Sequence, residues 1–329
     1  MMDDSSARSH PMDAQTQEWL NKLEDIGDEP GYFIPLGQRH HAILTEGSST
    51  LLVTFETIRS IRKDTDEELP LGFDLIADQG WSHLGLLADG DTWFRDPAVY
   101  QYFDQALDDG FFEEFDQVVF LGAGMCGYAA AAFSVVAPGS TVILFNPQAT
   151  LDPRVTEWDH RFKSRRRISF VDRYGYAPDM VDAADKVYLF YDPEEEMDAM
   201  HAALFTRPHI AKLRCRFLGG DIIQDMINMN ILQPLIDAAS EGSDVAERFH
   251  QLYRARHEYA RYMRRLLMHL SDDDRCILSG LLCRFALNHV ETPCFKERLG
   301  IIEQRLSAAG ITLPSARRVR KNAAFQPLS

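Results

Sequence analysis

The stretch Val118-Val119-Phe120-Leu121-Gly122-Ala123-Gly124-Met125-Cys126-Gly127-Tyr128-Ala129-Ala130-Ala131-Ala132 decides the fold. It begins as an apolar run of strand-forming residues, passes through closely spaced glycines and continues as an alanine-rich segment. This order predicts a strand, a sharp turn and a helix in immediate succession. In enzymes, such a turn exposes its apex residue at the edge of a parallel sheet.

The apex of this turn carries no nucleophile. In the pattern Gly-x-Ser-x-Gly, the serine would fall on Gly124 and the second glycine on Cys126. The sequence therefore predicts the backbone of a nucleophile turn without the attacking hydroxyl group.

Strand and helix patterns alternate on both sides of the turn. Apolar strand patterns cover residues 82–88, 116–121, 141–145, 186–191 and 212–218, and helical patterns cover 97–108, 125–136 and 198–205. Strand, helix and strand at this spacing predict right-handed parallel crossovers, hence a doubly wound, mostly parallel sheet. Two earlier β-rich runs, residues 41–45 and 49–55, flank Glu46-Gly47-Ser48 and predict an antiparallel N-terminal hairpin.

The remaining segments set the predicted domain organisation. Residues 13–26 carry an amphipathic helical pattern, and residues 152–185 are charged and aperiodic, as expected of an excursion over the carboxyl ends of the strands. From residue 222 the chain becomes helical. Residues 245–270 predict one long amphipathic helix, followed by helices over 277–289 and 295–309. We expect a disordered tail (1–12), an α/β domain (13–238), a helical extension (239–313) and a disordered basic tail (314–329).

Three segments carry a resemblance to a known family: residues 122–130, the Pro147-Gln148 pair after the next strand, and residues 91–97. They are similar to α/β-hydrolase-like proteins whose turn reads roughly Gly-Ser-Ser-Met-Gly-Gly-Tyr-Ala-Ala. The resemblance covers about residues 84–236 and implies an α/β-hydrolase-like fold.

The resemblance also implies where a catalytic triad would lie. In such enzymes an acid follows a late strand, often within Asp-x-x-His, and a histidine base follows the last strand in a Gly-His turn. Asp198-Ala199-Met200-His201 matches the first element, whereas Asp221 stands where the histidine would be. With Gly124 at the apex, the nucleophile and the base are both missing, and acyl transfer by a triad needs both.

Two residues are candidates for displaced chemistry, each with a structural alternative. Cys126 lies in the first turn of a helix, where exposed N–H groups stabilise a thiolate, but small-residue packing is the favoured interpretation. His201 could act as a base, although a helical histidine beside Asp198 is more often structural. A pocket for an oxyanion could survive, with the N–H of Met125 and another from the loop around Asp91 and Trp93 as ligand-binding donors.

The sequence predicts no cofactor and no metal. Gly122-x-Gly124-x-x-Gly127 satisfies a dinucleotide-binding pattern, but the next strand ends without the acidic residue that such a site needs. The acidic run 192–198 is interpreted as a solvated helix start. The five cysteines include no Cys-x-x-Cys pair, so we expect reduced thiols.

Net charge and hydropathy limit the classes of partner that the protein can bind. A net charge of −16 disfavours binding to nucleic acid, and no apolar run is long enough to span a membrane. Residues 1–13 are polar and lack the apolar core of a secretion signal, so we expect a cytoplasmic protein. The oligomeric state stays unknown. Residues 161–173 and 317–321 are locally basic and are interpreted as solvated surface, with an anionic ligand or protein partner as the alternative.

Three functions remain open at this point. The first is a noncatalytic hydrolase-like protein that binds an anionic ligand or a protein partner at the former active-site cleft. The second is a serine-independent esterase or glycan deacylase that uses displaced groups such as Cys126 or Asp221. The third is a phosphoadenosine phosphosulfate reductase, whose family motifs are absent, since Cys294 lies in Thr-Pro-Cys-Phe-Lys rather than Glu-Cys-Gly-Leu-His.

Overall fold

The computed structural model describes residues 14–27, 31–64, 68–270, 275–290 and 292–314. The chain divides into two compact units, residues 1–249 and residues 250–329. The predicted domain boundaries stay a prediction. The two predicted tails lie outside the described residues, apart from Pro314.

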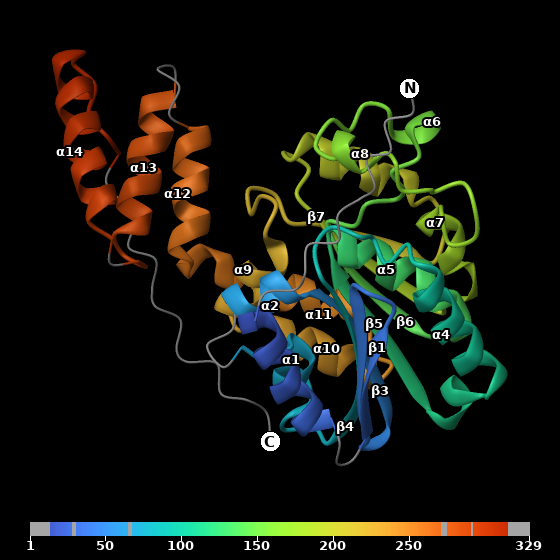
Figure 1. Cartoon of the computed structure of the whole chain (residues 1–329). Helices are drawn as coiled ribbons and strands as arrows, with labels where there is room; N and C mark the ends of the chain where they lie inside the picture. Colours follow the sequence, from blue (N-terminus) through green and yellow to red (C-terminus); the bar gives the residue numbers. More distant parts are fainter. Residues whose placement is uncertain (1–13, 28–30, 65–67, 271–274, 291, 315–329) are drawn as a thin grey trace. The chain divides into compact units, whose positions relative to one another are not determined.

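A single mixed sheet forms the centre of the first unit (Figure 1). Its order is β1-β2-β4-β3-β5-β6-β7-β8. The strands are β1 (Gly31–Leu36), β2 (His40–Thr45), β3 (Ser48–Thr57), β4 (Trp81–Ala88), β5 (Gln117–Ala123), β6 (Thr141–Phe145), β7 (Lys186–Tyr191) and β8 (Ile210–Arg214). From β4 to β8 in this order all neighbours are parallel, which confirms the predicted doubly wound sheet.

The antiparallel opening of the sheet is confirmed, but the predicted strand pair is wrong. The antiparallel hairpin joins β1 and β2, whereas β2 and β3 are separated by β4, which pairs antiparallel with β2 and parallel with β3. The turn at Glu46-Gly47 could not reveal this. A short polar segment can connect two strands that pair directly, and it can equally connect two strands that have a third strand between them.

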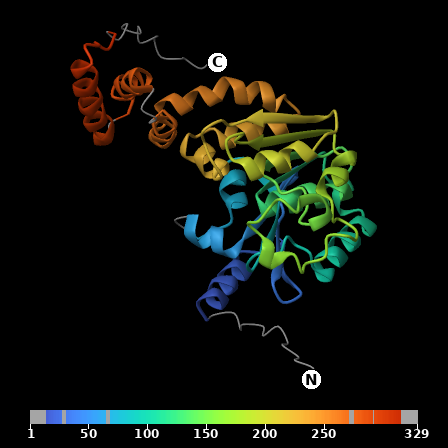
Figure 2. The same ribbon diagram turned by 90° about the horizontal axis from the view of Figure 1, so that it is seen from above.

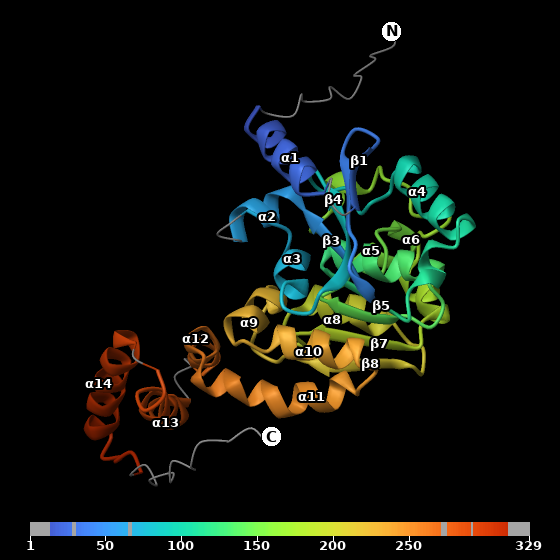
Figure 3. The ribbon, with the colours of Figure 1, turned by 90° about the horizontal axis from the view of Figure 1, so that it is seen from below.

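Helices cover both faces of the sheet (Figures 1 and 3). One face carries α4 (Pro97–Asp108), α5 (Met125–Phe133) and α7 (Ala177–Met180), and the opposite face carries α1 (Ala14–Gly27), α3 (Leu71–Ile76) and α10 (Leu232–Ser240). The other helices that lie wholly within the described part of this unit are α2 (Ile58–Asp64), α6 (Pro153–Thr156), α8 (Glu196–Leu204) and α9 (Ile222–Asn228), with the 3₁₀ turns η1 (Phe111–Glu114), η2 (Ser134–Val136), η3 (Lys163–Arg165) and η4 (Val181–Ala183).

The core follows from the alternation of side chains along the strands. In β2, Ala42 and Leu44 pack with the α4 and α5 face, whereas Ile43 packs with α1 on the other side. Aromatic rings fill the first face, and the ring centroids of Phe103 and Phe133 lie 4.4 Å apart. Burial of each such side chain contributes about 1.5–3 kcal/mol, so both helical layers stabilise the sheet.

The segment between β6 and β7 is the aperiodic excursion expected from the sequence, and its green to yellow-green ribbon can be followed in Figures 1 and 2. It is held to the start of α4 by Arg95, whose side chain is 2% exposed. The Arg95 guanidinium pairs with Asp172 and donates to the carbonyl oxygen of Ser169 at 3.0 Å. The excursion is therefore anchored to the helical layer rather than loose.

The predicted long helix over residues 245–270 is wrong as a single element. The chain forms α11 (Val245–Leu252), the 3₁₀ turn η5 (Tyr253–Glu258) and α12 (Ala260–His269), with Tyr259 in an extended conformation between the last two. Each piece keeps its own buried stripe, so the periodicity gave no sign of the break. α13 (Cys276–Ala286) and α14 (Pro293–Ala308) complete the second unit. Among the described residues, every helix is too short or too polar to span a lipid bilayer.

Candidate functional site

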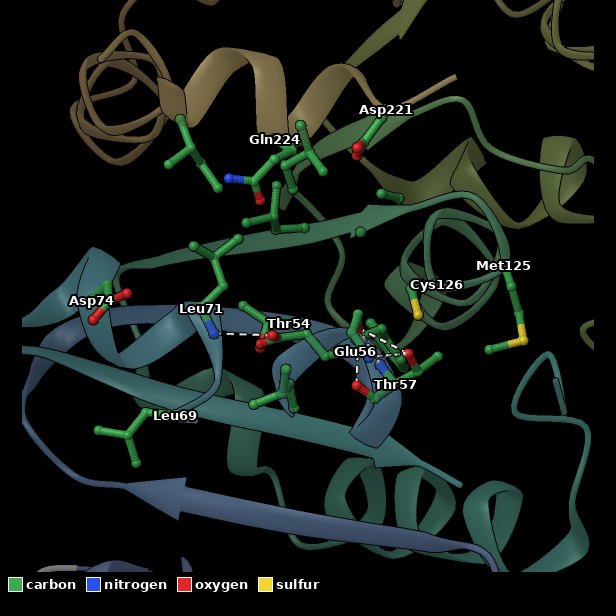
Figure 4. A pocket seen from close by; sticks show the side chains of 18 of the residues that line it. Thr54, Glu56, Thr57, Leu69, Leu71, Asp74, Met125, Cys126, Asp221 and Gln224 are labelled. Atoms are coloured by element: carbon green, nitrogen blue, oxygen red, sulfur yellow. Dashed lines mark hydrogen bonds between the residues drawn. The ribbon is translucent and has the colours of Figure 1, made fainter. Parts of the chain in front are cut away.

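A cavity of about 780 Å³ lies beside the sharp turn between β5 and α5. It is lined by the ends of β3 and β5, the first turn of α5, the start of α3 and one side of α9. Figure 4 shows Glu56, Cys126 and Asp221 around this cavity. Open α/β sheets bind ligands at the carboxyl ends of their strands, which is where this cavity lies.

The turn has the backbone of a nucleophile elbow. Gly124 has φ 57° and ψ −118°, a conformation that side-chain-bearing residues rarely adopt. Its N–H donates to the carbonyl oxygen of Phe145 at 2.8 Å, which ties the apex to β6. The strand, turn and helix context confirms the architecture expected from the sequence.

The glycines around the apex have different roles. A Cβ on Gly122 would lie 2.3 Å from the carbonyl oxygen of Cys126, so the helix can approach the strand only at a glycine. A Cβ on Gly124 would meet the Nε2 atom of Gln148 at 3.7 Å and nothing nearer. No close contact therefore excludes a side chain at the apex, although Gly124 itself is not among the residues that line the cavity.

The loop after β8 carries no imidazole. Asp221 stands there, directly before α9, and lines the cavity. The N–H of Gly219 in this loop donates to the carboxylate of Asp192 at 2.6 Å. Asp192 follows β7 directly and is 1% exposed. The carboxylate that contacts the loop after β8 is thus Asp192, which the sequence did not single out. The interpretation of the acidic run 192–198 as solvated is wrong for Asp192 and Asp198, which are 1% and 5% exposed. The place of Asp192 immediately after a buried strand was a usable signal.

Asp198 and His201 belong to a separate buried network. Asp198 accepts hydrogen bonds from Asn146 at 2.8 Å and from Arg161 at 2.6 Å. His201 accepts the N–H of Ala149 at Nδ1, so its Nε2 carries the proton and donates to Asp159 at 3.0 Å. The structure does not bring either residue to the cavity lining, and both imidazole nitrogens are occupied, as the structural alternative for His201 requires.

Cys126 lines the cavity but its thiol is not activated. Burial, reinforced by the charge of Glu56, raises the pKa of this thiol far above its usual range. The helix N-terminus does not compensate, because removing a thiolate from water costs more than the exposed N–H groups return. Cys126 is therefore a protonated thiol at neutral pH.

This protonation state predicts selective alkylation. Cys294 is exposed, so iodoacetamide at pH 7.5 should modify Cys294 in the native protein and leave Cys126 unmodified. Peptide mass spectrometry before and after denaturation measures both sites, and both should react once the chain is unfolded. Rapid modification of native Cys126 would contradict the inert thiol.

Of the three predicted ligand-binding residues, two line the cavity and one does not. Met125 and Asp91 line the cavity, and Asp91 pairs with Arg165 at 3.1 Å. Trp93 does not line the cavity; it is 1% exposed, and its indole N–H donates to Gln148 at 3.2 Å. Because β3 rather than β4 is the neighbour of β5, the loop after β3 lies closer to the turn than the loop around Asp91.

Glu56 is the second residue that the sequence reasoning missed. It lies near the end of β3, and burial raises its pKa to about 7, against hydrogen bonds from Leu71, Thr54 and Gly72 that lower it. No motif marks this residue. From the sequence alone, an isolated glutamate in a β-rich run is expected at the exposed edge of a strand. Only the strand order, in which β3 is the neighbour of β5, places Glu56 beside the turn.

The charge of the cavity differs from the sequence expectation of an anionic ligand. Its lining contains no lysine, arginine or histidine among the described residues, and includes the carboxylates of Glu56, Asp74, Asp91 and Asp221. Within segment 161–173, Arg165 pairs with the lining carboxylate of Asp91. Away from the cavity, Arg161 pairs with two aspartates and Arg173 with Asp104. An anion would meet a field of its own sign at this site.

Comparisons with known proteins found similarity to solved structures at low sequence identity. No family profile and no curated protein sequence matches it. Among solved structures it is similar to the capsule O-acetyltransferase of Neisseria meningitidis serogroup A (10% identity, TM-score 0.41, covering 65% of this chain and 99% of that chain). It is also similar to carboxyl esterase 2 from Tuber melanosporum (10% identity, TM-score 0.40, 72% and 99%) and to a Pyrobaculum calidifontis esterase (14% identity, TM-score 0.39, 71% and 91%). The α/β-hydrolase-like fold itself follows from the strand order and the turn described above.

Proposed function

We propose that the protein is a noncatalytic α/β-hydrolase-like protein that binds a ligand in the cavity beside its degenerate elbow. The observation that carries this proposal is the apex itself: Gly124 holds the elbow conformation and supplies no attacking atom. The binding space persists at about 780 Å³, within the usual size of small-molecule sites.

The arrangement around the apex supports binding rather than catalysis. The base position carries Asp221, and His201 has both nitrogens in hydrogen bonds away from the cavity lining. A triad that has lost its members keeps a residual acceleration of roughly 10³–10⁴ over water, from binding and oxyanion contacts alone. That level is the most we expect from this chain.

A hydrolase with displaced groups is the second candidate, because Cys126 and Glu56 line the same cavity. Screening wild type and Cys126→Ala against activated esters separates the two functions. We expect no turnover above the residual level, and no change on removal of the thiol. Hydrolysis by wild type that disappears in Cys126→Ala would overturn the noncatalytic proposal.

Restoring the nucleophile alone should not restore activity. Gly124→Ser has room for the side chain, but serine at a positive φ costs about 2 kcal/mol and finds no imidazole at the base position. We expect lower stability in urea denaturation and unchanged ester hydrolysis. The double variant Gly124→Ser/Asp221→His is the matched comparison, because it supplies the base as well. An active single variant would show that another group serves as base.

A further inference from the structure

Hydrogen bonds fix the carboxyl group of Glu56 in the wall of the cavity. Its Oε2 accepts the N–H of Leu71 at 2.9 Å, its Oε1 accepts the hydroxyl of Thr54 at 3.1 Å, and the N–H of Gly72 is a further donor. These donors come from β3 and from the start of α3. The carboxyl group is therefore held in one orientation rather than free to turn into solvent.

A buried histidine stands behind this carboxyl group. Nε2 of His83 lies 2.8 Å from the Thr54 hydroxyl oxygen, and the Thr54 hydroxyl donates its single proton to Glu56. His83 must then carry its proton on Nε2, and its Nδ1 is buried without a partner. Burial lowers the pKa of His83 to about 3, so this imidazole is neutral and does not compensate the charge of Glu56.

Glu56 keeps acceptor capacity for a ligand. A carboxylate offers about four lone-pair sites, and the donors from Thr54, Leu71 and Gly72 use three of them. Glu56 lines the cavity, so a ligand in the cavity can reach the remaining acceptor site of its carboxylate (Figure 4). The Glu56 side chain is half-buried and has no basic partner among the described residues. A carboxylate partly removed from water without a cation is unfavourable, so a positive charge at this point would be stabilising.

The rest of the lining fits the same ligand. The lining contains both aliphatic and polar side chains, and the apolar members include Leu69, Leu71, Leu121, Ile223 and Ile227. No basic side chain among the described lining residues competes for Glu56. A short aliphatic chain with a positive charge would satisfy both parts of the wall.

We propose that the cavity binds an organic cation and that the Glu56 carboxylate pairs with the ammonium group of this ligand. The inference rests on the proposed function, that the cavity is a binding site, and it names the ligand class. The recognised chemistry is a protonated amine on a flexible aliphatic chain.

The pairing makes binding pH-dependent in a defined direction. The amine binds the ionised form of Glu56, so affinity falls as the pH falls through about 7, the pKa of this carboxyl group. The groups that face Glu56 or share its cavity are the following: His83 from β4, Asp74 from α3, Cys126 from α5, Asp91 after β4 and Asp221 before α9. Between pH 6 and pH 8 His83 stays neutral and Cys126 stays protonated, because burial lowers the pKa of His83 to about 3 and raises the pKa of Cys126 far above its usual range.

Three probes with the same five-carbon chain test the ligand class. Isothermal titration calorimetry of the full chain would measure 1,5-diaminopentane (cation), 1,5-pentanediol (neutral) and glutarate (anion) at pH 8 and pH 6. We expect the diamine to bind at least about tenfold more tightly than the diol at pH 8, and to lose about tenfold in affinity at pH 6.

Variants assign the effect to Glu56. Glu56→Gln should weaken diamine binding about tenfold at pH 8 and abolish its pH dependence, whereas Glu56→Asp keeps the charge and should keep the pH dependence. Glu157→Gln is the matched control, because Glu157 is exposed and lies outside the cavity lining. The pH profile of wild type decides the matter even if the variants fold poorly.

Each contrary outcome has one meaning. Equal binding of the diol, or preferred binding of glutarate, overturns the cation while leaving the cavity as a binding site. Absence of diamine binding at millimolar concentration overturns the proposed ligand class. Diamine binding that is unchanged in Glu56→Gln overturns the role of Glu56. Failure of the proposed function is read separately, from the ester screen on wild type and Cys126→Ala.

Discussion

Replacing Gly122 by alanine is expected to destabilise the first unit by about 3 kcal/mol or more. The new Cβ would lie 2.3 Å from the carbonyl oxygen and 2.5 Å from the carbonyl carbon of Cys126. Both are backbone atoms of the first turn of α5, so relief requires the helix to move away from β5. The turn, and with it the cavity lining, would be displaced.

Urea denaturation of Gly122→Ala against wild type measures this loss. Gly220→Ala is the matched control, since a Cβ at Gly220 meets no atom within 4 Å and the residue lies in the same unit. We expect the control to change the free energy of unfolding by well under 1 kcal/mol. Equal stabilities of the two variants would show that α5 does not depend on its close approach to the strand.

Glu56→Gln is expected to remove a pH-dependent contribution of about 3 kcal/mol to stability. The pKa of Glu56 is about 7 in the folded protein, against an ordinary value of 4.5. The folded chain therefore binds an extra proton between these values, and wild type loses stability as the pH rises through this window. Glutamine has no such titration.

The measurement is a difference of differences. The free energy of unfolding of Glu56→Gln minus that of wild type should rise by about 3 kcal/mol between pH 4 and pH 8. Titration of His83 and of other groups common to both proteins cancels in this comparison. Glu157→Gln, at an exposed position, should show no such trend. A flat difference for Glu56→Gln would mean that this carboxyl group is ionised at neutral pH like any solvated glutamate.

Much of the fold was predictable from residues near one another in the chain. The strand, glycine turn and helix around Gly124 were expected, and the structure has them as β5 and α5. The helix over residues 97–108 was expected from Pro97, and the structure adds the Asp96 side chain as its N-terminal cap. Such features depend on local backbone preferences and on burial periodicity, which a sequence displays directly.

The strand pairing was less predictable. The turn at Glu46-Gly47 suggested that two consecutive strands pair, but β4 lies between them. The long helix over residues 245–270 was likewise interrupted at Tyr259, although the apolar stripe continued on both sides. For the strand pairing, the deciding interactions are with β4, which is distant in the chain, and they leave no trace in the composition of the turn.

The candidate site also has some features that the sequence reveals and others that only the tertiary structure reveals. The missing nucleophile at Gly124 and the aspartate at position 221 could be recognised from the order of residues alone, because a substituted side chain needs no structure to be seen. The hydrogen-bond partners of Asp192, Glu56 and His201 could not. Asp192 faces Gly219, Glu56 faces Leu71, and His201 faces Asp159, and these partners are 27, 15 and 42 positions away in the chain. Which carboxylate is buried, paired or turned toward a cavity depends on the strand order and the packing of the sheet, and the tertiary structure decides it because burial and hydrogen bonding are set by neighbours in space.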